Sequence, residues 1–523
     1  MPDSGHIIVE FLETTAAAYP DSPAVRWFVK KKEIAEKTYG DLNSDRRKVT
    51  NALLGRGYSG QQVALIGTSA YEWIASYLGI ISAKMTAVPL DPMLPPAELC
   101  DLLNRSDSHA VFVSPKLVSY LEMFQANCPA VSLYILLGAE ASPERKDTIS
   151  FAELISDVDD TPLSEDLKPG SDDVCTFIYT SGTTGKSKGV MLTQRNIYED
   201  VSNVTVSFAP GSTMLSVLPI HHAYCLSMEW LKGISLGSIF YINDSLLHMI
   251  RNIGLVKPSI LIMVPLMIEV IAKYLAGADP SIPKRDVAIK VLGENLTHIF
   301  SGGAHLDPSL IGFFEEYGII VCEGYGMSEC SPTISTNDQN SCRPGSVGKL
   351  LKNMEVRFVD GEIQVKGSNV MKGYYQMPKE TEEAFMDGWL RTGDLGHIDE
   401  DGYLYITGRL KNLIILSNGE NISPEEIENN LLTHDLVGEV VIAGEANGLA
   451  ARIFPSPEVI EARELTEQAV AAELQAIIDE YNKTQPTYRA ITALIVRKYP
   501  FVKNATKKIV RAKMDIDEAP QES

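Results

Sequence analysis

Short apolar runs bounded by turn residues alternate with helix-like segments through much of the chain. The runs include VALIG at 63–67, AVFVS at 110–114 and SLYILLG at 132–138, and the helix-like segment YEWIASYLGIISAK follows the first of them. Strands that alternate with helices are typical of βαβ units, in which helices cover both faces of a parallel sheet. No repeat of fixed period is visible, which argues against a solenoid or propeller. The pattern predicts an α/β fold.

Residues 352–407 follow a different pattern from the rest. The segments MEVRFVDGEIQVKG and GYLYITG alternate apolar and polar residues around a glycine or aspartate turn, which is typical of antiparallel hairpins. Beyond them come short strands, EVVIAGE and ALIVRK, and a helix, TEQAVAAELQAIIDEYNKT. We predict an N-terminal domain, 1–409, of βαβ sheets with a small hairpin or barrel region, and an α+β C-terminal domain, 410–523. The second domain is long enough to fold by itself.

The chain is strongly acidic, with 46 Lys and Arg against 68 Asp and Glu and a formal net charge of −22. A protein that binds nucleic acid without sequence preference needs a basic surface, so we expect no nucleic-acid partner. The overall field repels an anionic ligand such as a nucleotide. Local donors and positive side chains must therefore hold any such ligand.

Cysteine spacing and hydropathy indicate the compartment. The seven cysteines are scattered without a C-x-x-C pair, so we expect reduced, mostly buried thiols rather than disulfides or a zinc site. The N-terminus lacks the basic-then-apolar pattern of a signal peptide. The most apolar segment, IGLVKPSILIMVPLMIEVIAKYL, is interrupted by Lys257, Pro258 and Pro265, so no transmembrane segment is predicted. We expect a cytoplasmic protein; its oligomeric state is not indicated.

The segment YTSGTTGKSKGV, residues 179–190, carries the first candidate chemistry. Its centre is similar to the end of a P-loop, but Thr180 stands where that motif needs its first glycine. The glycines allow the backbone N–H groups to turn inward as an anion nest, and the hydroxyl groups and Lys186 add donors and positive charge. On composition alone, a flexible surface loop remains an equal alternative.

With its flanking residues, the segment resembles the phosphate loop of the adenylate-forming superfamily: acyl- and aryl-CoA synthetases, luciferases and peptide-synthetase adenylation domains. It departs from that signature only at Ser187, where proline is usual. The resemblance implies ATP and Mg²⁺ as cofactors, with Thr180 also near the metal. The implied phosphate-binding residues are Thr180, Ser181, Gly182, Thr183, Thr184, Gly185 and Lys186.

Three further motifs resemble the family's in the family's order. LPIHHAYC implies that His222 lies beside the carboxylate substrate, although a buried core histidine is the alternative for that residue alone. SGGAHL implies an adenine-binding turn, as does EGYG within EGYGMSEC. In the latter motif, Ser328 would donate to the α-phosphate and Glu329 would hold Mg²⁺, whereas an ordinary capped turn is the alternative. The implied adenine-binding residues are Gly302, Gly303, Ala304, Glu323, Gly324, Tyr325 and Gly326.

The remaining motifs lie near the predicted domain boundary and the C-terminus. WLRTGDLGHIDEDGYLYITGRLKNLI implies that Asp394 and Arg409 contact the ribose and that Lys411 is a hinge. Gly419 is the position expected to approach the thiol arm of the acceptor. PFVKNATKKIVR implies Lys508 as the catalytic lysine and contains Lys507 where glycine is common. The family's C-terminal domain swings between reaction steps.

The resemblance implies an acid–thiol ligase that forms an acyl-adenylate, releases pyrophosphate and transfers the acyl group to coenzyme A. No aspartate lies between His222 and Trp230 to pair with an amino-acid substrate, so an apolar acid is expected. Leu226, Met228 and Trp230 either line its pocket or belong to the core. The sequence is similar to bacterial long-chain fatty-acid–CoA ligases, which implies a medium- or long-chain acid. Two alternatives remain open: a carrier protein's phosphopantetheine as acceptor, and a non-catalytic nucleotide sensor.

Overall fold

A computed structural model describes residues 5–30, 33–138, 147–180, 187–340, 342–415, 421–445, 448–486, 489–503 and 509–518. The chain divides into two compact units, each described separately below. The first comprises Met1–Val356, Val365–Arg391 and Glu400–Leu404, and the second comprises Arg357–Gln364, Thr392–Asp399 and Tyr405–Ser523. The domain boundary between residues 409 and 410 stays a prediction.

An eight-stranded sheet in the first unit has the order β19-β9-β8-β4-β3-β5-β6-β7. Its strands are β3 (Gln62–Ile66), β4 (Thr86–Leu90), β5 (Ser108–Val113), β6 (Leu133–Leu136), β7 (Thr148–Ser150), β8 (Val174–Thr180), β9 (Lys188–Thr193) and β19 (Gly373–Tyr374). The strands from β4 through β3 and β5 to β7 pair in parallel, as the buried VALIG and AVFVS runs predict. By contrast, β8 and β9 pair antiparallel, and the phosphate-loop motif includes the end of β8 and the start of β9.

Helices surround this sheet, some in contact with its strands and others packed on neighbouring helices. They are α1 (Val9–Ala18), α2 (Tyr39–Gly55), α3 (Tyr71–Ile81), α4 (Pro96–Arg105), α5 (Leu121–Asn127), α6 (Phe151–Ile155) and α7 (Gln194–Asn203). Every residue of α3 except Glu72 is buried, which explains its apolar sequence. A Cβ atom on Gly79 of α3 would lie 2.6 Å from a methyl group of Val49 in α2, so glycine permits this close helix contact.

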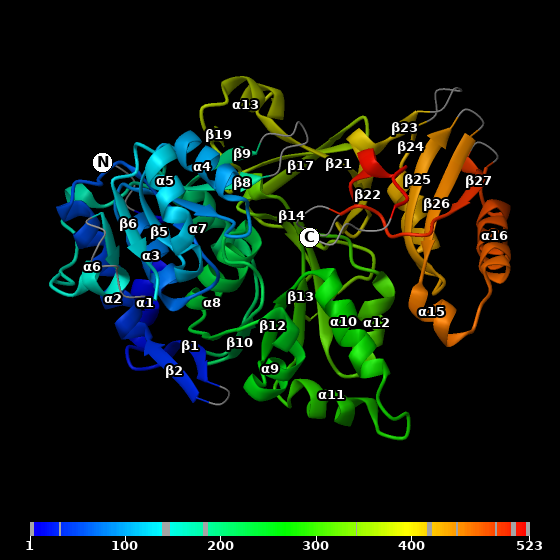
Figure 1. The fold of residues 1–523 in the computed structure, drawn as a ribbon, viewed down its shortest axis with the longest axis horizontal. Helices are drawn as coiled ribbons and strands as arrows, with labels where there is room; N and C mark the ends of the chain where they lie inside the picture. The colour runs from blue at the N-terminus through cyan, green and yellow to red at the C-terminus, as the bar shows by residue number, and fades with distance from the viewer. Residues whose placement is uncertain are drawn as a thin grey trace. The chain divides into compact units, whose positions relative to one another are not determined.

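A nine-stranded sheet in the same unit has the order β16-β15-β14-β13-β12-β10-β11-β1-β2. Its strands are β1 (Pro23–Lys30), β2 (Glu33–Thr38), β10 (Thr213–Ser216), β11 (Ile239–Ile242), β12 (Ile260–Met263), β13 (His298–Ser301), β14 (Ile320–Gly326), β15 (Thr333–Thr336) and β16 (Lys349–Leu350). The strands β10, β12, β13 and β14 are parallel, and the sheet becomes antiparallel at β15. These strands alternate with helices along the chain (Figure 1), so the predicted α/β class is confirmed.

The helices around this sheet are α8 (Lys232–Ser235), α9 (Met249–Val256), α10 (Pro265–Ala276), α11 (Lys284–Leu292) and α12 (Pro308–Glu316), and α13 (Pro378–Ala384) follows β19. The most apolar segment of the sequence is divided among the end of α9, strand β12 and α10. Within the part of the chain that the structure describes, no helix is both long and apolar enough to cross a bilayer.

The antiparallel hairpins predicted for residues 352–407 are present. The strands β17 (Met354–Val359), β18 (Glu362–Gly367), β20 (Phe385–Met386), β21 (Trp389–Ile398) and β22 (Leu404–Arg409) form a five-stranded sheet. Asp360 and Gly361 connect β17 to β18 with φ angles of 52° and 80°, as a two-residue hairpin turn requires.

The C-terminal part of the second unit is an α+β fold with its own core. Strands β25 (Val437–Glu445), β26 (Gly448–Pro455) and β27 (Ile491–Val496) form a sheet, and β23 (Ile414–Ile415) pairs with β24 (Asn421–Ile422). The helices are α14 (Pro424–Leu431), α15 (Pro457–Ala462) and α16 (Glu467–Lys483). Leu474 and Ile478 of α16 bury their side chains with Ile427 of α14 and Ile453 of β26.

Candidate active site

Two of the motifs lie side by side at one edge of the nine-stranded sheet. Ser301, the last residue of β13, is paired in register with Glu323 of β14. Because the two strands are parallel, the SGGA turn and the EGYG segment leave the same edge of the sheet. Ligands in α/β proteins bind at this carboxyl edge.

The SGGA turn lies against an aromatic ring that the motif analysis did not single out. A Cβ atom on Gly302 would lie 2.8 Å from Cζ of Tyr224, so only glycine fits there without displacing the ring. The Tyr224 hydroxyl donates a hydrogen bond of 3.2 Å to the carbonyl oxygen of Phe300. Gly303 has a φ of 82°, and the exposed Ala304 follows it. A turn of small residues beside a tyrosine ring fits a flat base such as adenine. In the sequence, the position of Tyr224, two residues after His222, could have indicated that it lies near the site.

Glu323 stabilises this turn through its own carboxyl group. Its Oε1 accepts a hydrogen bond of 3.1 Å from the backbone N–H of Leu306, beyond the SGGA turn. Burial raises the pKa of Glu323 to about 7. The backbone carbonyl of Glu323 accepts two further bonds from Asn337, at 3.1 Å from the N–H and 3.0 Å from Nδ2. These bonds fix the strand that continues through Gly324, Tyr325 and Gly326.

Glu329, the predicted metal ligand, is buried and oriented by a second tyrosine. The hydroxyl of Tyr374 donates to Oε1 of Glu329 at 2.9 Å, and the Glu329 carbonyl accepts from the N–H of Met371 at 2.8 Å. Tyr374 lies on β19 opposite Val190 of β9, the last residue of the phosphate-loop motif. The ammonium group of Lys188 lies 4.8 Å from the centre of the Tyr374 ring, within cation–π range. The carboxylate is thereby linked to the end of the phosphate loop.

This donor set fits a magnesium–nucleotide complex. Mg²⁺ is bound in proteins by one or two carboxylates together with phosphate oxygens and water. Glu329 supplies such a carboxylate, and Ser328 precedes it with a partly exposed side chain. Thr180, the other predicted metal neighbour, is a partly exposed residue at the end of β8. Sequence reasoning found Glu329 but missed Tyr374 and the contact of Lys188, because a strand distant in sequence supplies the tyrosine.

A buried polar network holds the Ser328–Glu329 turn from behind. Nδ2 of Asn369 donates to the carbonyl oxygens of Cys330 at 3.0 Å and Thr333 at 2.7 Å. Oδ1 of Asp200 accepts from the N–H of Thr333 at 2.9 Å, and burial raises the pKa of Asp200 to about 8. Buried hydrogen bonds of this kind restrict a turn to one conformation. Nothing in the sequence indicated that Asp200 and Asn369 would meet.

His222, predicted to lie beside the carboxylate substrate, follows the buried His221. The His222 side chain is exposed, yet desolvation by the surrounding protein lowers its pKa, an effect that Asp91 partly opposes. The neighbouring His221 is buried, and burial lowers its pKa to about 3. The two ring centres are 4.3 Å apart. A neutral, accessible imidazole can hydrogen-bond a carboxylate without a full ion pair.

The residues that follow His222 form an apolar interior. Leu226, Met228 and Trp230 are all buried, and the Trp230 ring stacks on Phe240 with centres 4.5 Å apart. Glu229, the one acid in this segment, is buried, and burial raises its pKa to about 8. It is therefore largely neutral at pH 7 and presents no fixed charge that would pair with a substrate amine.

In the second unit, the two predicted ribose-contacting residues lie together. Nε of Arg409 is 2.8 Å from Oδ1 of Asp394, whose side chain is almost fully buried. Arg409 is half-exposed, as is appropriate for a group that meets a ligand. Partial burial and the nearby Arg409 charge lower the pKa of Lys411, the predicted hinge residue.

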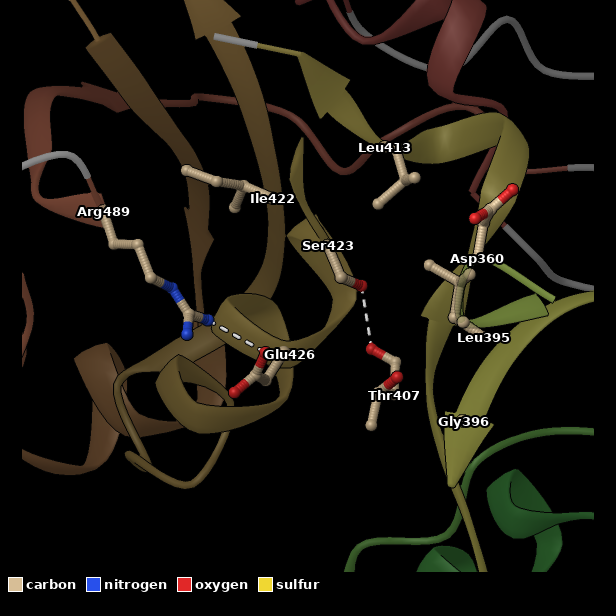
Figure 2. A pocket seen from close by; sticks show the side chains of 10 residues that line it. Asp360, Leu395, Gly396, Thr407, Leu413, Ile422, Ser423, Glu426 and Arg489 are labelled. Atoms are coloured by element: carbon tan, nitrogen blue, oxygen red, sulfur yellow. Dashed lines mark hydrogen bonds and ion pairs between the residues drawn. The ribbon is translucent and has the colours of Figure 1, made fainter. Parts of the chain in front are cut away.

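The second unit contains a cavity of about 300 Å³, lined by residues from both sides of Lys411 in the sequence. Figure 2 shows the side chains that line it. The Ser423 hydroxyl donates to the Thr407 carbonyl at 2.8 Å, and Arg489 pairs with Glu426 at 2.9 Å. A Cβ atom on Gly408 would overlap Oγ of Ser423. Among the predicted site residues that the structure describes, none lines this cavity, which is bounded by Asp360, Gly361, Leu395, Gly396, Thr407, Leu413, Ile422, Ser423, Glu426 and Arg489.

Several predicted site residues lie outside the described part of the chain. They are Ser181, Gly182, Thr183, Thr184, Gly185, Lys186, Gly419 and Lys508. Residues close to Lys508 in sequence are described and anchored: Lys503 pairs with Glu439 at 2.6 Å, and Arg511 pairs with Glu428.

Comparison with protein families gives two matches in chain order. Residues 12–375 match the AMP-binding enzyme family, and residues 411–516 match the AMP-binding enzyme C-terminal domain. A long-chain-fatty-acid–CoA ligase, FadD15 of Mycobacterium tuberculosis, is 29% identical over 77% of this chain and 74% of its own. A long-chain-fatty-acid–CoA ligase of Salmonella typhimurium is 28% identical over 86% of this chain and 84% of its own.

Solved structures share the fold at lower identity. The anthranilate–CoA ligase AuaEII in complex with anthranoyl-AMP has a TM-score of 0.82 at 22% identity, covering 96% of this chain and 95% of its own. ATP-bound MatB from Rhodopseudomonas palustris has a TM-score of 0.78 at 23% identity, covering 95% of this chain and 96% of its own. The family match extends over well over half of the residues. The chain belongs to the AMP-binding enzyme family.

Proposed function

We propose that this protein is an ATP-dependent acid–thiol ligase. It activates an apolar carboxylic acid, a medium- or long-chain fatty acid, to an acyl-adenylate with release of pyrophosphate, and then transfers the acyl group to coenzyme A. The observation that carries the proposal is the arrangement at the edge of the nine-stranded sheet. There, the glycine turn beside Tyr224 follows β13, and the buried Glu329 lies in the turn that follows the adjacent strand β14, in a chain of the AMP-binding enzyme family.

The first step joins two anions, so the residues must position charge and neutralise it. Glu329 would hold Mg²⁺, which supplies charge neutralisation at the phosphate oxygens. Ser328 would donate to the α-phosphate, and residues 180–186 would bind the β- and γ-phosphates. Lys508 would stabilise the charge that develops as the substrate carboxylate attacks the α-phosphorus.

The ribose and the adenine are assigned to separate elements. Asp394 would accept hydrogen bonds from the ribose hydroxyls, and it forms an ion pair with Arg409. Gly302, Gly303 and Ala304 would line one side of the adenine, and Tyr325 would flank it. Glu323 contributes by fixing the backbone of both turns rather than by a free carboxylate.

The second step needs a different set of residues. Lys508 has no role when a thiol attacks the adenylate carbonyl, so we propose that rotation about Lys411 removes it and brings Gly419 toward the thiol arm. The acceptor we propose is coenzyme A. The phosphopantetheine of an acyl-carrier protein is the alternative, because it presents the same arm.

The apolar interior near His222 supports an apolar acid. Leu226, Met228 and Trp230 are apolar and buried, and the neutral Glu229 offers no charge to an amino-acid substrate. The printed names of the curated relatives, long-chain-fatty-acid–CoA ligases, point to the same substrate class. Because such acids and coenzyme A are used inside the cell, we propose that the protein works in the cytoplasm.

A screen of carboxylic acids by pyrophosphate release tests this function. Straight-chain fatty acids of increasing length, aryl acids and an α-amino acid are each incubated with protein, ATP and Mg²⁺, with and without coenzyme A. We expect pyrophosphate release with fatty acids and sustained turnover only when coenzyme A is present. Turnover that requires a pantetheinylated carrier protein would favour the alternative acceptor. Absence of release with every acid would favour a nucleotide sensor.

Two lysine variants test the proposed division between the steps. Lys508→Ala should lower adenylate formation by about 10²–10³ while leaving thiol transfer from pre-made acyl-adenylate intact. Lys507→Ala, at the neighbouring position, is the matched control and should have a mild effect. Equal loss of both steps in Lys508→Ala would contradict the rotation about Lys411.

A further inference from the structure

Two cysteines lie in direct contact beside the strand that carries the EGYG motif. Sγ of Cys322, on β14, is 2.7 Å from Sγ of Cys342. Cys322 is buried and Cys342 is partly exposed. Both thiols also lie within reach of the carbonyl oxygen of Asp338, at 3.7 Å and 3.5 Å. The proposed reaction mechanism uses neither thiol.

We propose that Cys322 and Cys342 form a thiol–disulfide modification site, which low-molecular-weight disulfides such as glutathione disulfide convert to an intramolecular disulfide. The Cys342 thiolate attacks one sulfur of glutathione disulfide, which forms a mixed disulfide and releases one glutathione thiolate. Cys322 then attacks Sγ of Cys342 and expels the second glutathione, which takes up the Cys322 proton. In total, two protein thiols and one glutathione disulfide give one protein disulfide and two glutathione thiols.

Exposure determines which cysteine reacts first. Cys342 is partly exposed, whereas the other six cysteines are buried. The hydrogen bond with Cys342 and burial raise the pKa of Cys322, so Cys322 is not the first thiol to react while Cys342 is reduced. Thiolates are the attacking species and need access to the oxidant, so Cys342 is the entry point and Cys322 resolves the mixed disulfide.

A second close pair of cysteines in the first unit provides an internal control. The Cys128 thiol is directed at the carbonyl oxygen of Cys100, at 3.9 Å. Cys100 and Cys128 are 6% and 1% exposed, and no partly exposed cysteine accompanies them. The oxidant therefore has no accessible thiol there, although two cysteines are adjacent.

The disulfide should form without distorting the adenine-binding strand. A disulfide has a sulfur–sulfur length of about 2.05 Å, so the two sulfur atoms need to approach by less than about 1 Å. Asn337 already ties the segment before Cys342 to β14 through its two bonds to the Glu323 carbonyl. The new bond adds a covalent link between segments that already touch. It should stabilise the folded protein, because it restricts the unfolded chain between the two residues.

The test uses the intact protein treated with glutathione disulfide and analysed by mass spectrometry and non-reducing peptide mapping. We expect the loss of two hydrogen atoms, one peptide pair joined through Cys322 and Cys342, and a thermal midpoint that rises by a few degrees. Cys342→Ser should form no disulfide and show no rise. Cys322→Ser should retain glutathione on Cys342, and Cys128→Ser, the matched control, should oxidise like the wild type.

Three outcomes would overturn the proposal. One is a wild-type protein that does not react, or that keeps glutathione on Cys342. In the latter case, the buried Cys322 would fail to resolve the mixed disulfide. Another is a disulfide between any other pair of cysteines. The third is oxidation of Cys342→Ser at the wild-type rate. Cys342 is partly exposed, so we expect Cys342→Ser to fold. The test therefore gives a clear result even if Cys322→Ser does not fold.

Discussion

The hydroxyl group of Tyr374 provides the sharpest test of the candidate metal site. It donates to Oε1 of Glu329 at 2.9 Å, and both residues are buried in the first unit. Tyr374→Phe removes this single donor and keeps the ring on which the Lys188 ammonium rests at 4.8 Å. The substitution therefore separates the orientation of Glu329 from the contact with the phosphate-loop motif.

The size of the effect follows from the burial of the pair. A hydrogen bond to a charged group contributes about 1.5–3 kcal/mol, and a buried pair loses little of this to solvent screening. Since about 1.4 kcal/mol corresponds to a factor of ten, the loss amounts to roughly 10–100-fold. Removing a group that orients a metal ligand typically costs about 10–100-fold in metal affinity, which is the same range.

Two measurements check this prediction. Binding of Mn²⁺, titrated by electron paramagnetic resonance with a non-hydrolysable ATP analogue present, should weaken by about 10–100-fold in Tyr374→Phe. Pyrophosphate release should need a correspondingly higher Mg²⁺ concentration, with a smaller change at saturating metal. Tyr375→Phe is the matched control, because the hydroxyl of Tyr375 donates to Asp107 instead. Unchanged Mn²⁺ affinity in Tyr374→Phe, or an equal loss in Tyr375→Phe, would refute the role of Tyr374.

Three further substitutions probe other parts of the structure. Gly302→Ala places a Cβ atom 2.8 Å from the Tyr224 ring, so ATP affinity measured by calorimetry should fall at least about tenfold. Wild-type affinity in that variant would exclude this turn from the adenine site. Burial raises the pKa of Asp200 to about 8, so the folded protein holds a proton that the unfolded chain releases above about pH 4. The free energy of unfolding should therefore fall as pH rises from about 4 to 8, and urea titrations at several pH values should show this slope. Asp200→Asn should flatten the slope. An unchanged slope in this variant would contradict the proposed protonation of Asp200. The Cβ atom added in Gly408→Ala would overlap Oγ of Ser423, which would disfavour the observed arrangement around Lys411. The ratio of the rate of adenylate formation to the rate of thiol transfer should therefore change. An unchanged ratio would show that the arrangement around Lys411 does not limit either step.

The sequence by itself determined the fold class, and it predicted the residues of the candidate site. Buried runs such as VALIG predicted parallel strands, and the alternation around Asp360 and Gly361 predicted a hairpin that the structure contains. These features are local, since a pattern of a few residues decides which side chains can be buried. The ordered motifs singled out His222 and Glu329 without knowledge of their surroundings.

Only the tertiary structure decided which distant residues support that site. Tyr374 meets Glu329 across 45 positions, Asn369 meets Asp200 across 169, and Cys322 meets Cys342 across 20. No local pattern encodes such contacts, because they depend on which strands become neighbours and in what register. The motifs named the groups that we propose to carry the chemistry, whereas long-range packing selected the groups that contact them.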